Sequence, residues 1–228
     1  MLTMGLDTAL QRCSVAIVRD GEILSERAAG MERGHAEHLA PMAAAALAEA
    51  GVRVKDLDRI GVVVGPGGFT GVRVGLSFAR GLAIGVEVPV VGVTSLAALA
   101  GNVADAPETA LIAPVIDARR AQVYAALYDA KGAVRIAPFV AAPEEALKKL
   151  ADEAAGAETA LVGTGAALFG ETPRGWRRSA APDQIDAKVV ARLAAAAPVP
   201  PGPPAPLYLR PPDAKPPRVG LLTGRAGP

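Results

Sequence analysis

The sequence predicts an α/β fold made of two related halves. The first indication is the stretch from Ile60 to Val93, in which apolar runs at 60–64 and 88–93 flank a helical segment. Strand, helix and strand in this order are typical of a right-handed βαβ unit on a mostly parallel sheet. The second indication is an internal repeat. A pattern of strand, acidic loop, strand and turn around Asp7 returns 110 residues later around Asp117.

The first half begins with short apolar runs separated by polar turns. We expect three strands there, at residues 2–6, 13–18 and 22–29. The loop between the first two carries Asp7, and Asp20 with Gly21 forms the turn between the second and third. An amphipathic helix follows at 35–50 and stops at Gly51.

The helix at 70–86, for which Thr70 is the expected N-cap, is the most unusual element. A helix that covers its own sheet needs an apolar arc of about 100°, and this one has roughly twice that. Small residues also recur at every fourth position, namely Gly71, Gly75, Ala79 and Ala83. Another backbone could approach closely along this track. The sequence leaves open whether a second helix of the same subunit or a partner protein does so.

The second half repeats the opening pattern and then diverges. After a helix at 94–103, capped by Thr94 or Ser95, we expect strands at 111–116, 122–128 and 159–162 and helices at 144–154 and 185–197. From Pro198 the chain is rich in proline, which excludes a helix and disfavours a central strand. The segment 207–210 is apolar enough to dock on the protein, and we expect disorder after Asp213.

Composition excludes several classes of protein. The 228 residues carry a net charge of +1 with acids and bases interspersed, so no strongly basic surface indicates autonomous binding of nucleic acid. Cys13 is the only cysteine, which excludes a disulfide within the chain. Asp7 lies where a signal peptide would need an apolar core, and no uninterrupted apolar run reaches membrane-spanning length. We therefore expect a soluble cytoplasmic protein.

Common catalytic motifs do not fit. The glycine-rich loop 65–71 is followed by Val72 and Arg73 instead of the lysine of a phosphate-binding loop, and its order of glycines does not match a dinucleotide fingerprint. The stretch 75–79 does not match the GxSxG pattern of a nucleophilic serine. The two histidines, His35 and His38, have no further ligands at the spacing of a zinc site. The sequence therefore predicts no metal site of this kind.

Two acidic loops remain as candidates for ligand binding. Asp7 and Asp117 both follow apolar strands, and two carboxylates facing each other across a cleft could hold magnesium and the phosphates of a nucleotide. Alternatively, each carboxylate caps its own tight loop. Gly163 and Gly165, which flank Thr164 after a strand, either let the backbone approach a nucleoside or simply turn the chain.

Five segments of the chain resemble the TsaB family, also called YeaZ. These are LDTALQRCSVAIV, GHAEHLAPM, VGPGGFTGVRVGLSFARGLAIG, DARRAQVYAALY and LYLRPPDAK, and the resemblance runs over most of residues 1–215. It implies a duplicated actin-like ATPase fold with a mixed sheet and flanking helices in each subdomain. The expected subdomains are 1–104, with the partner-binding helices, and 105–212, with the C-terminal helix. Residues 213–228 would form a proline-rich tail.

The resemblance also implies a function. TsaB is a partner of TsaD and TsaE in making N6-threonylcarbamoyladenosine in tRNA, and TsaD is the transferase whose metal is held by a His-x-x-x-His pair. The comparable segment of this chain, 94–102, has no histidine. The chain is therefore similar to the noncatalytic paralogue. It would be a scaffold that forms a homodimer in isolation and contacts tRNA only through the complex.

Specific residues follow from this resemblance. The pairing elements would be the helices at 35–50 and 70–86, and the expected interface residues are His38, Leu39, Met42, Ala46, Gly71, Gly75, Leu76, Ala79, Leu82 and Ala83. No cofactor would be tightly bound. ATP or ADP with magnesium could bind at the interface of the complex, and the sequence leaves open whether a nucleotide sits in the cleft of this subunit or at that junction. The residues nearest to a nucleotide would be Asp7, Thr8, Asp117, Arg119, Gly163 and Gly165. The alternatives are a self-contained actin-like ATPase that uses the two aspartates and, ranked last, a glycoprotease-like peptidase.

Overall fold

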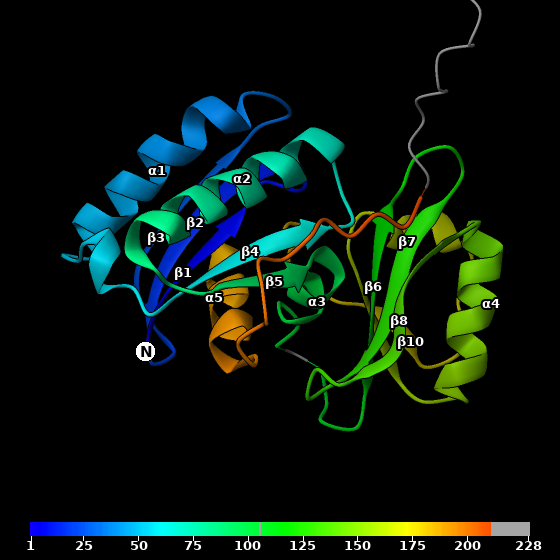
Figure 1. Cartoon of the computed structure of the whole chain (residues 1–228). Coiled ribbons are helices and arrows are strands. Elements are labelled where there is room, and N and C mark those ends of the chain that lie inside the picture. The colour runs from blue at the N-terminus through cyan, green and yellow to red at the C-terminus, as the bar shows by residue number, and fades with distance from the viewer. Residues whose placement is uncertain (105, 211–228) are drawn as a thin grey trace, which may run out of the picture.

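The computed structural model describes residues 1–104 and 106–210 and consists of two five-stranded sheets with flanking helices (Figure 1). The strand order is β3-β2-β1-β4-β5 in the first sheet and, read from the opposite edge, β8-β7-β6-β9-β10 in the second. Each strand of the first sheet therefore has a counterpart at the same position in the second. The strand directions correspond as well. In both sheets the first three strands in the chain are antiparallel and the last two pair in parallel. The duplicated actin-like architecture is confirmed.

The first subdomain comprises the elements up to Ala100. Its strands are β1 (Leu2–Asp7), β2 (Arg12–Arg19), β3 (Glu22–Gly30), β4 (Arg59–Gly65) and β5 (Val90–Thr94). Its helices are α1 (His35–Glu49), the short 3₁₀ helix η1 (Val54–Asp56), α2 (Phe69–Val86) and α3 (Ser95–Ala100). The Thr94 hydroxyl accepts a hydrogen bond from the N–H of Ala97, which confirms Thr94 as the cap of α3.

The second subdomain has the same order of strands and main helices, without a counterpart of η1. Its strands are β6 (Leu111–Asp117), β7 (Val123–Asp129), β8 (Val134–Ala141), β9 (Thr159–Val162) and β10 (Trp176–Arg178). Its helices are α4 (Pro143–Ala154), the 3₁₀ helix η2 (Ala166–Phe169) and α5 (Ala187–Ala196). The position of α2 in the first half is thus taken by the four-residue η2 in the second.

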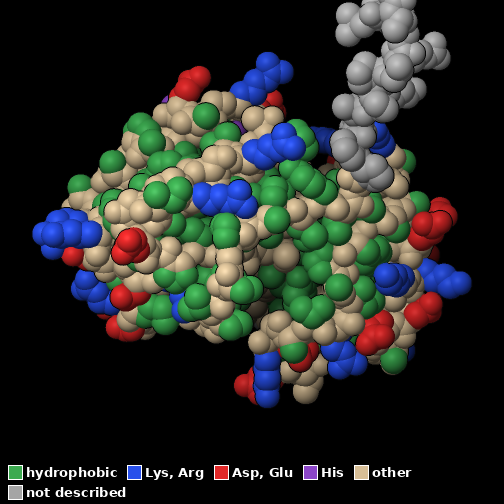
Figure 2. Space-filling view, in the orientation of Figure 1, with side chains coloured by type: hydrophobic (Ala, Val, Ile, Leu, Met, Phe, Trp, Pro, Cys, Tyr) green, Lys and Arg blue, Asp and Glu red, His purple; other side chains and the backbone are tan. Residues whose placement is uncertain are grey.

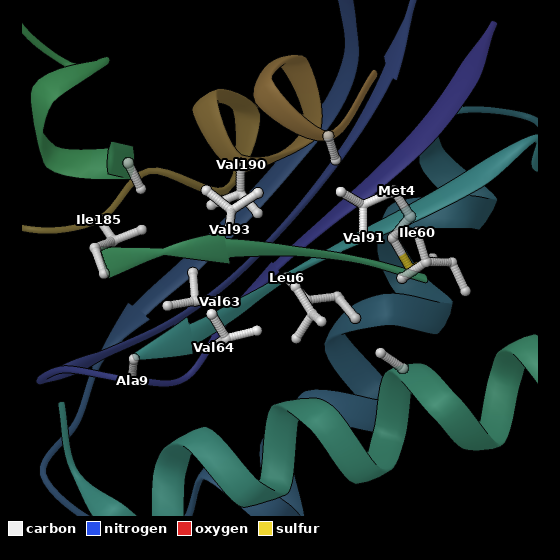
Figure 3. Close-up of a cluster of buried hydrophobic side chains, with 14 of the residues drawn as sticks. Met4, Leu6, Ala9, Ile60, Val63, Val64, Val91, Val93, Ile185 and Val190 are labelled. Carbon is white, nitrogen blue, oxygen red and sulfur yellow. The ribbon is translucent and has the colours of Figure 1, made fainter. Parts of the chain in front are cut away.

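Alternation along the strands decides which helix covers which face of the first sheet. A Cβ atom at Gly5 would lie 2.0 Å from the carbonyl oxygen of Ala187, and one at Gly61 would lie 2.5 Å from the Cβ of Ala194, so both glycines let α5 approach the sheet backbone. Helices α1 and α2 cover the other face. Figure 3 shows Val93 of β5 beside Val190 of α5, with Ile185 just before that helix, and Leu6 of β1 on the opposite side of the sheet.

The last helix of each half packs against the sheet of the other half. Helix α3, which follows the first sheet, contacts β6 and β7, while α5, which follows the second sheet, contacts β1, β2 and β4. Arg59 fixes the end of α5 by donating hydrogen bonds to the carbonyl oxygens of Ala194 and Ala197, at 2.6 and 2.5 Å. The sequence assigned this C-terminal helix to the second subdomain. In the structure, the buried face of α5 meets the first sheet, although the helix follows the second sheet in the chain.

Local details differ from the expectations at the start of α2 and at two strands. Helix α2 begins at Phe69 with Gly68 at the N-cap position and no side-chain cap, so the prediction that Thr70 caps it is wrong. The strands β8 and β10 were not recognised in the sequence. The segment 207–210 docks as expected, whereas the predicted disorder after Asp213 lies outside the described residues.

Among the described residues, α2 is the one helix that is long and apolar enough to cross a membrane by length and composition. Its apolar face packs against β4, and the opposite side carries Arg73 and Ser77. Only 28% of this helix is buried inside the subunit, so packing on the sheet accounts for part of its apolar composition.

Candidate functional site

A groove with a volume of about 480 Å³ lies between α1 and α2 on the first subdomain. Most of the side chains that line it are apolar, and the others are two hydroxyl side chains and an arginine. The lining residues are Ala36, Leu39, Phe69, Thr70, Arg73, Val74, Ser77 and Phe78. Because the second half has only η2 in place of α2, this pair of exposed helices occurs once in the described part of the chain.

The small-residue track on α2 faces the subunit's own interior. A Cβ atom at Gly71 would lie 2.0 Å from the carbonyl oxygen of Thr8, and one at Gly75 would lie 2.6 Å from the hydroxyl of Thr8 and 3.4 Å from Val62. Ala79 is fully buried. The track is therefore filled by the β1–β2 loop and by β4, rather than by a second helix or a partner.

This packing changes the list of candidate interface residues. Five of the predicted contacts are buried inside the subunit and do not line the groove: Ala46, Gly71, Gly75, Leu76 and Ala79; Leu39 is buried as well but lines the groove. For these residues the prediction is corrected, because they hold the two helices on the sheet. His38 is exposed, and Met42, Leu82 and Ala83 are half-buried, so these four residues remain available at the surface.

Asp7 is enclosed at the end of β1. Its side chain is fully buried, its Oδ1 accepts a hydrogen bond of 2.9 Å from the N–H of Ala9, and its Oδ2 has no partner among the described residues. Burial raises the pKa of Asp7 from its ordinary 3.8 to about 7, against the smaller lowering effects of the Ala9 N–H and of Arg12. The neighbouring Thr8 hydroxyl donates to the carbonyl oxygen of Gly71 at 2.7 Å, and this bond ties the loop to α2.

Asp117 occupies the corresponding position at the end of β6, in a more exposed setting. Its Oδ1 accepts a hydrogen bond of 2.7 Å from the N–H of Arg119, two residues on, as the carboxylate of Asp7 does from Ala9. The guanidinium of Arg119 lies 3.3 Å from the other oxygen. Both carboxylates therefore cap their own loops, the second of the two interpretations left open by the sequence.

The glycines after β9 also have a packing explanation. A Cβ atom at Gly163, where φ is +102°, would lie 2.4 Å from the carbonyl oxygen of Val115, and one at Gly165 would lie 2.8 Å from the carbonyl carbon of Ile116. Both positions let the turn after β9 contact the backbone of β6. The geometry does not bring the six predicted nucleotide-binding residues together as one open site, since Asp7 and Thr8 are enclosed while Asp117 and Arg119 pair with each other.

Sequence reasoning missed a cluster at the edge of the groove. The ring of Tyr208, from the proline-rich segment, stacks on Phe69 with a centroid distance of 5.6 Å, and the guanidinium of Arg73 lies 3.6 Å from the centroid of Phe69. The Nε of Arg73 donates to the Tyr208 hydroxyl at 2.9 Å. Only the apolar character of 207–210 indicated docking in advance, and the sequence did not indicate where.

Other reactive groups are distributed without forming a recognisable centre. Within residues 1–104 and 106–210, no group of three histidine, cysteine or acidic side chains could hold a metal ion. His35 contacts the carbonyl oxygen of Leu10 at 3.2 Å. Burial raises the pKa of the Cys13 thiol to about 11, so this cysteine is a poor nucleophile near neutral pH.

Comparison with known proteins places these features in context. The family model described as TsaD, tRNA N6-adenosine threonylcarbamoyltransferase, matches residues 22–196. The tRNA threonylcarbamoyladenosine biosynthesis protein TsaB of Bacillus subtilis is 34% identical over 131 residues, which cover 58% of this chain and 56% of that protein. The matched region thus spans about half the length of the TsaB relative.

Two further similarities cover nearly the whole length of both chains. An uncharacterized protein of Mycobacterium tuberculosis is 38% identical over 217 residues, which cover 93% of each chain. The solved structure of YeaZ from Pseudomonas aeruginosa superposes with a TM-score of 0.71 at 32% identity and covers 85% of this chain and 90% of that one.

Proposed function

Because the chain belongs to the TsaB family, also called YeaZ, we propose that it takes part in the biosynthesis of N6-threonylcarbamoyladenosine in tRNA as a noncatalytic subunit. In this proposal it binds a TsaD-type transferase, acts together with a TsaE-type ATPase, and forms a homodimer when the transferase is absent. It works in the cytoplasm and contacts tRNA only through the assembly.

The observation that carries the proposal is the exposed groove between α1 and α2. The two helices bury one side against the first sheet and leave between their outer sides an apolar groove lined by Phe78 and Val74, with Ser77 and Arg73 on its rim. A groove of this kind accepts the helices of a partner, and an interface of standard size needs roughly 800 Å² from each protein. The four accessible residues of the expected interface lie on the same two helices.

The residues around α3 support a noncatalytic role. In the resemblance described above, the transferase holds its metal with two histidines on a helix, whereas α3 has the sequence SLAALA. Both histidines of this chain lie at the start of α1 instead. The proposal therefore assigns the transfer step to the partner. It includes no cofactor that the isolated chain binds tightly, and it places any ATP or ADP with magnesium at the junction with the transferase.

The test uses a charged side chain placed in the groove. Ser77 is exposed and lines the groove, so Ser77→Arg adds bulk and charge there without entering the core. The matched control is Val134→Arg on β8, whose side chain is 57% exposed on the other subdomain. We expect Ser77→Arg to weaken binding to a TsaD-type transferase at least tenfold in calorimetric titration, and Val134→Arg to bind like the wild type.

A reconstituted reaction then tests the biochemical role. Modification of tRNA by the transferase and the ATPase should require the wild-type chain and should fall with Ser77→Arg in proportion to the lost binding. Equal binding by both variants would contradict the proposed interface. Modification of tRNA by the purified chain alone would contradict the noncatalytic role.

A further inference from the structure

Arg73 is the one charged side chain that lines the groove between α1 and α2 in the described part of the chain. It is exposed and lies on the same face of α2 as two hydroxyl side chains, Thr70 and Ser77. Figure 2 shows blue side chains over α2 with no red side chain between them, and the basic residues of α2 are Arg73 and Arg80. Within residues 1–104 and 106–210, neither arginine forms an ion pair with a carboxylate.

The proline-rich segment 204–210, termed the strap below, holds the guanidinium of Arg73 in one orientation (Figure 1). The N–H of Leu207 donates to the carbonyl oxygen of Val64 at 2.8 Å, which places the strap beside the end of β4. The Tyr208 hydroxyl then accepts a hydrogen bond of 2.9 Å from Nε of Arg73, while the guanidinium lies 3.6 Å from the ring centroid of Phe69. The hydrogen bond uses one of the five N–H groups of the guanidinium, so the four N–H groups on the Nη atoms remain for an incoming acceptor.

A guanidinium fixed in this way is a favourable anchor for a carboxylate. Arginine binds carboxylates through two parallel N–H···O bonds, and a side chain that is already ordered loses little conformational entropy when the pair forms. The rings of Phe69 and Tyr208 are 51% and 49% exposed, so the cluster is accessible at the surface. It lies at the edge of an apolar groove and therefore fits a partner that presents a carboxylate beside an apolar helix face.

The same charge disfavours a second copy of this chain as the occupant of the groove. In a symmetric dimer the same surface patch lies on both sides of the interface. The groove linings of two copies then bring together two guanidinium groups and no carboxylate. Like charges brought together in an interface oppose binding, whereas a carboxylate opposite Arg73 favours it. Charge complementarity therefore favours a different protein over a second copy.

We propose that Arg73 is the charged anchor of the groove and binds a carboxylate on a helix of the TsaD-type transferase, with Tyr208 of the strap as its positioning residue. This inference rests on the proposed function, which gives the transferase as the partner. The apolar side of the partner's helix lies against Val74 and Phe78, and its carboxylate reaches the Nη atoms of Arg73. The ion pair selects the transferase over a second copy of the chain.

The first test removes the charge with Arg73→Gln. The matched control is Arg174→Gln, which removes the same charge from an exposed position on the second subdomain. Calorimetric titration measures binding to the transferase, and sedimentation equilibrium of the isolated chain measures the homodimer. We expect Arg73→Gln to weaken binding of the transferase about tenfold and to tighten the homodimer about threefold, with Arg174→Gln like the wild type in both assays. Thermal melts check that each chain is folded.

Opposite changes in the two associations separate a charge effect from a structural one, because a distorted groove would weaken both. An unchanged affinity for the transferase, or equal weakening of both associations by Arg73→Gln, would overturn the proposal. Ser77→Arg distinguishes this failure from that of the proposed function. If Ser77→Arg weakens binding of the transferase and Arg73→Gln does not, only the anchor is wrong. If neither variant weakens it, the proposed interface is wrong as well.

The second test concerns the positioning role of the strap. Tyr208→Phe removes the hydroxyl that accepts from Arg73 and keeps the ring that stacks on Phe69. We expect it to weaken binding of the transferase about threefold in the wild-type background and to have no effect in Arg73→Gln, because it acts through the guanidinium. Effects of the two substitutions that simply add would overturn the positioning role.

Discussion

The contact between α2 and the β1–β2 loop is tight enough for a single methyl group to test it. In Gly71→Ala, the new Cβ atom would lie 2.0 Å from the carbonyl oxygen of Thr8. Carbon and oxygen cannot approach so closely, and a backbone atom cannot rotate away as a side chain can. The loop and the helix must separate, which also disturbs the hydrogen bond from the Thr8 hydroxyl to Gly71.

The expected magnitude follows from three terms. Overpacking of a tight core contact costs about 1–3 kcal/mol, and loss of a buried hydrogen bond costs about 1 kcal/mol. The higher helix propensity of alanine offsets at most about 1 kcal/mol of this loss in stability. The free energy of unfolding should therefore fall by about 1–3 kcal/mol. Gly81→Ala on the same helix provides a matched control of opposite sign, because Gly81 is exposed and a Cβ atom added there would have no neighbour within 4 Å.

Urea unfolding followed by far-ultraviolet circular dichroism measures both variants against the wild type. The free energy of unfolding of Gly81→Ala should exceed that of the wild type by up to about 1 kcal/mol, because this substitution changes only the helix propensity and the conformational freedom of the unfolded chain. Midpoints that shift in opposite directions would support the geometry. If Gly71→Ala were as stable as Gly81→Ala, the small-residue track would not face Thr8, and it would again be available to a partner.

Two further predictions concern buried charged groups. Burial raises the pKa of Asp7 to about 7, so the protonated carboxyl favours the folded state below about pH 4, and this advantage is lost as the pH rises to about 7. Between pH 4 and pH 8, the unfolding free energy of the wild type should therefore fall by a few kcal/mol relative to that of Asp7→Asn, as measured by urea titrations. A difference between the two proteins that does not vary with pH would contradict the burial of the carboxyl. Arg59→Met removes the hydrogen bonds to the end of α5 and should lower the unfolding free energy by about 2–4 kcal/mol in the same assay, whereas an unchanged midpoint would show that α5 is held by packing alone.

The sequence predicted most of the strands and helices because their apolar periodicity is local. The βαβ unit around β4, α2 and β5 was recognised, and the repeat of Asp7 and Asp117 corresponds to equivalent strand ends in the two sheets. Strand β8 was missed because its side chains are half-buried or exposed, which weakens the alternation that identifies a strand. Strand β10 has only three residues and shows no pattern of its own.

The candidate site was harder to predict because periodicity shows that a face is covered and does not show what covers it. The stripe through Gly71 and Gly75 has the spacing of a close helix contact, and a sheet loop, a neighbouring helix and a partner all satisfy that spacing equally well. The atom that fills the stripe belongs to Thr8, 63 residues earlier in the chain. Only the folded arrangement of β1 and β4 brings the two segments together.

The same limit explains why the two repeated aspartates differ. The sequence pattern does not distinguish Asp7 from Asp117. In the structure, each carboxylate likewise accepts a hydrogen bond from the N–H two residues later in the chain. Their surroundings differ because α2 covers the first loop, whereas the second half has only η2 after β9 and leaves Asp117 to pair with Arg119 at the surface. Helix α2 therefore both encloses one carboxylate and, together with α1, lines the exposed groove on its outer side.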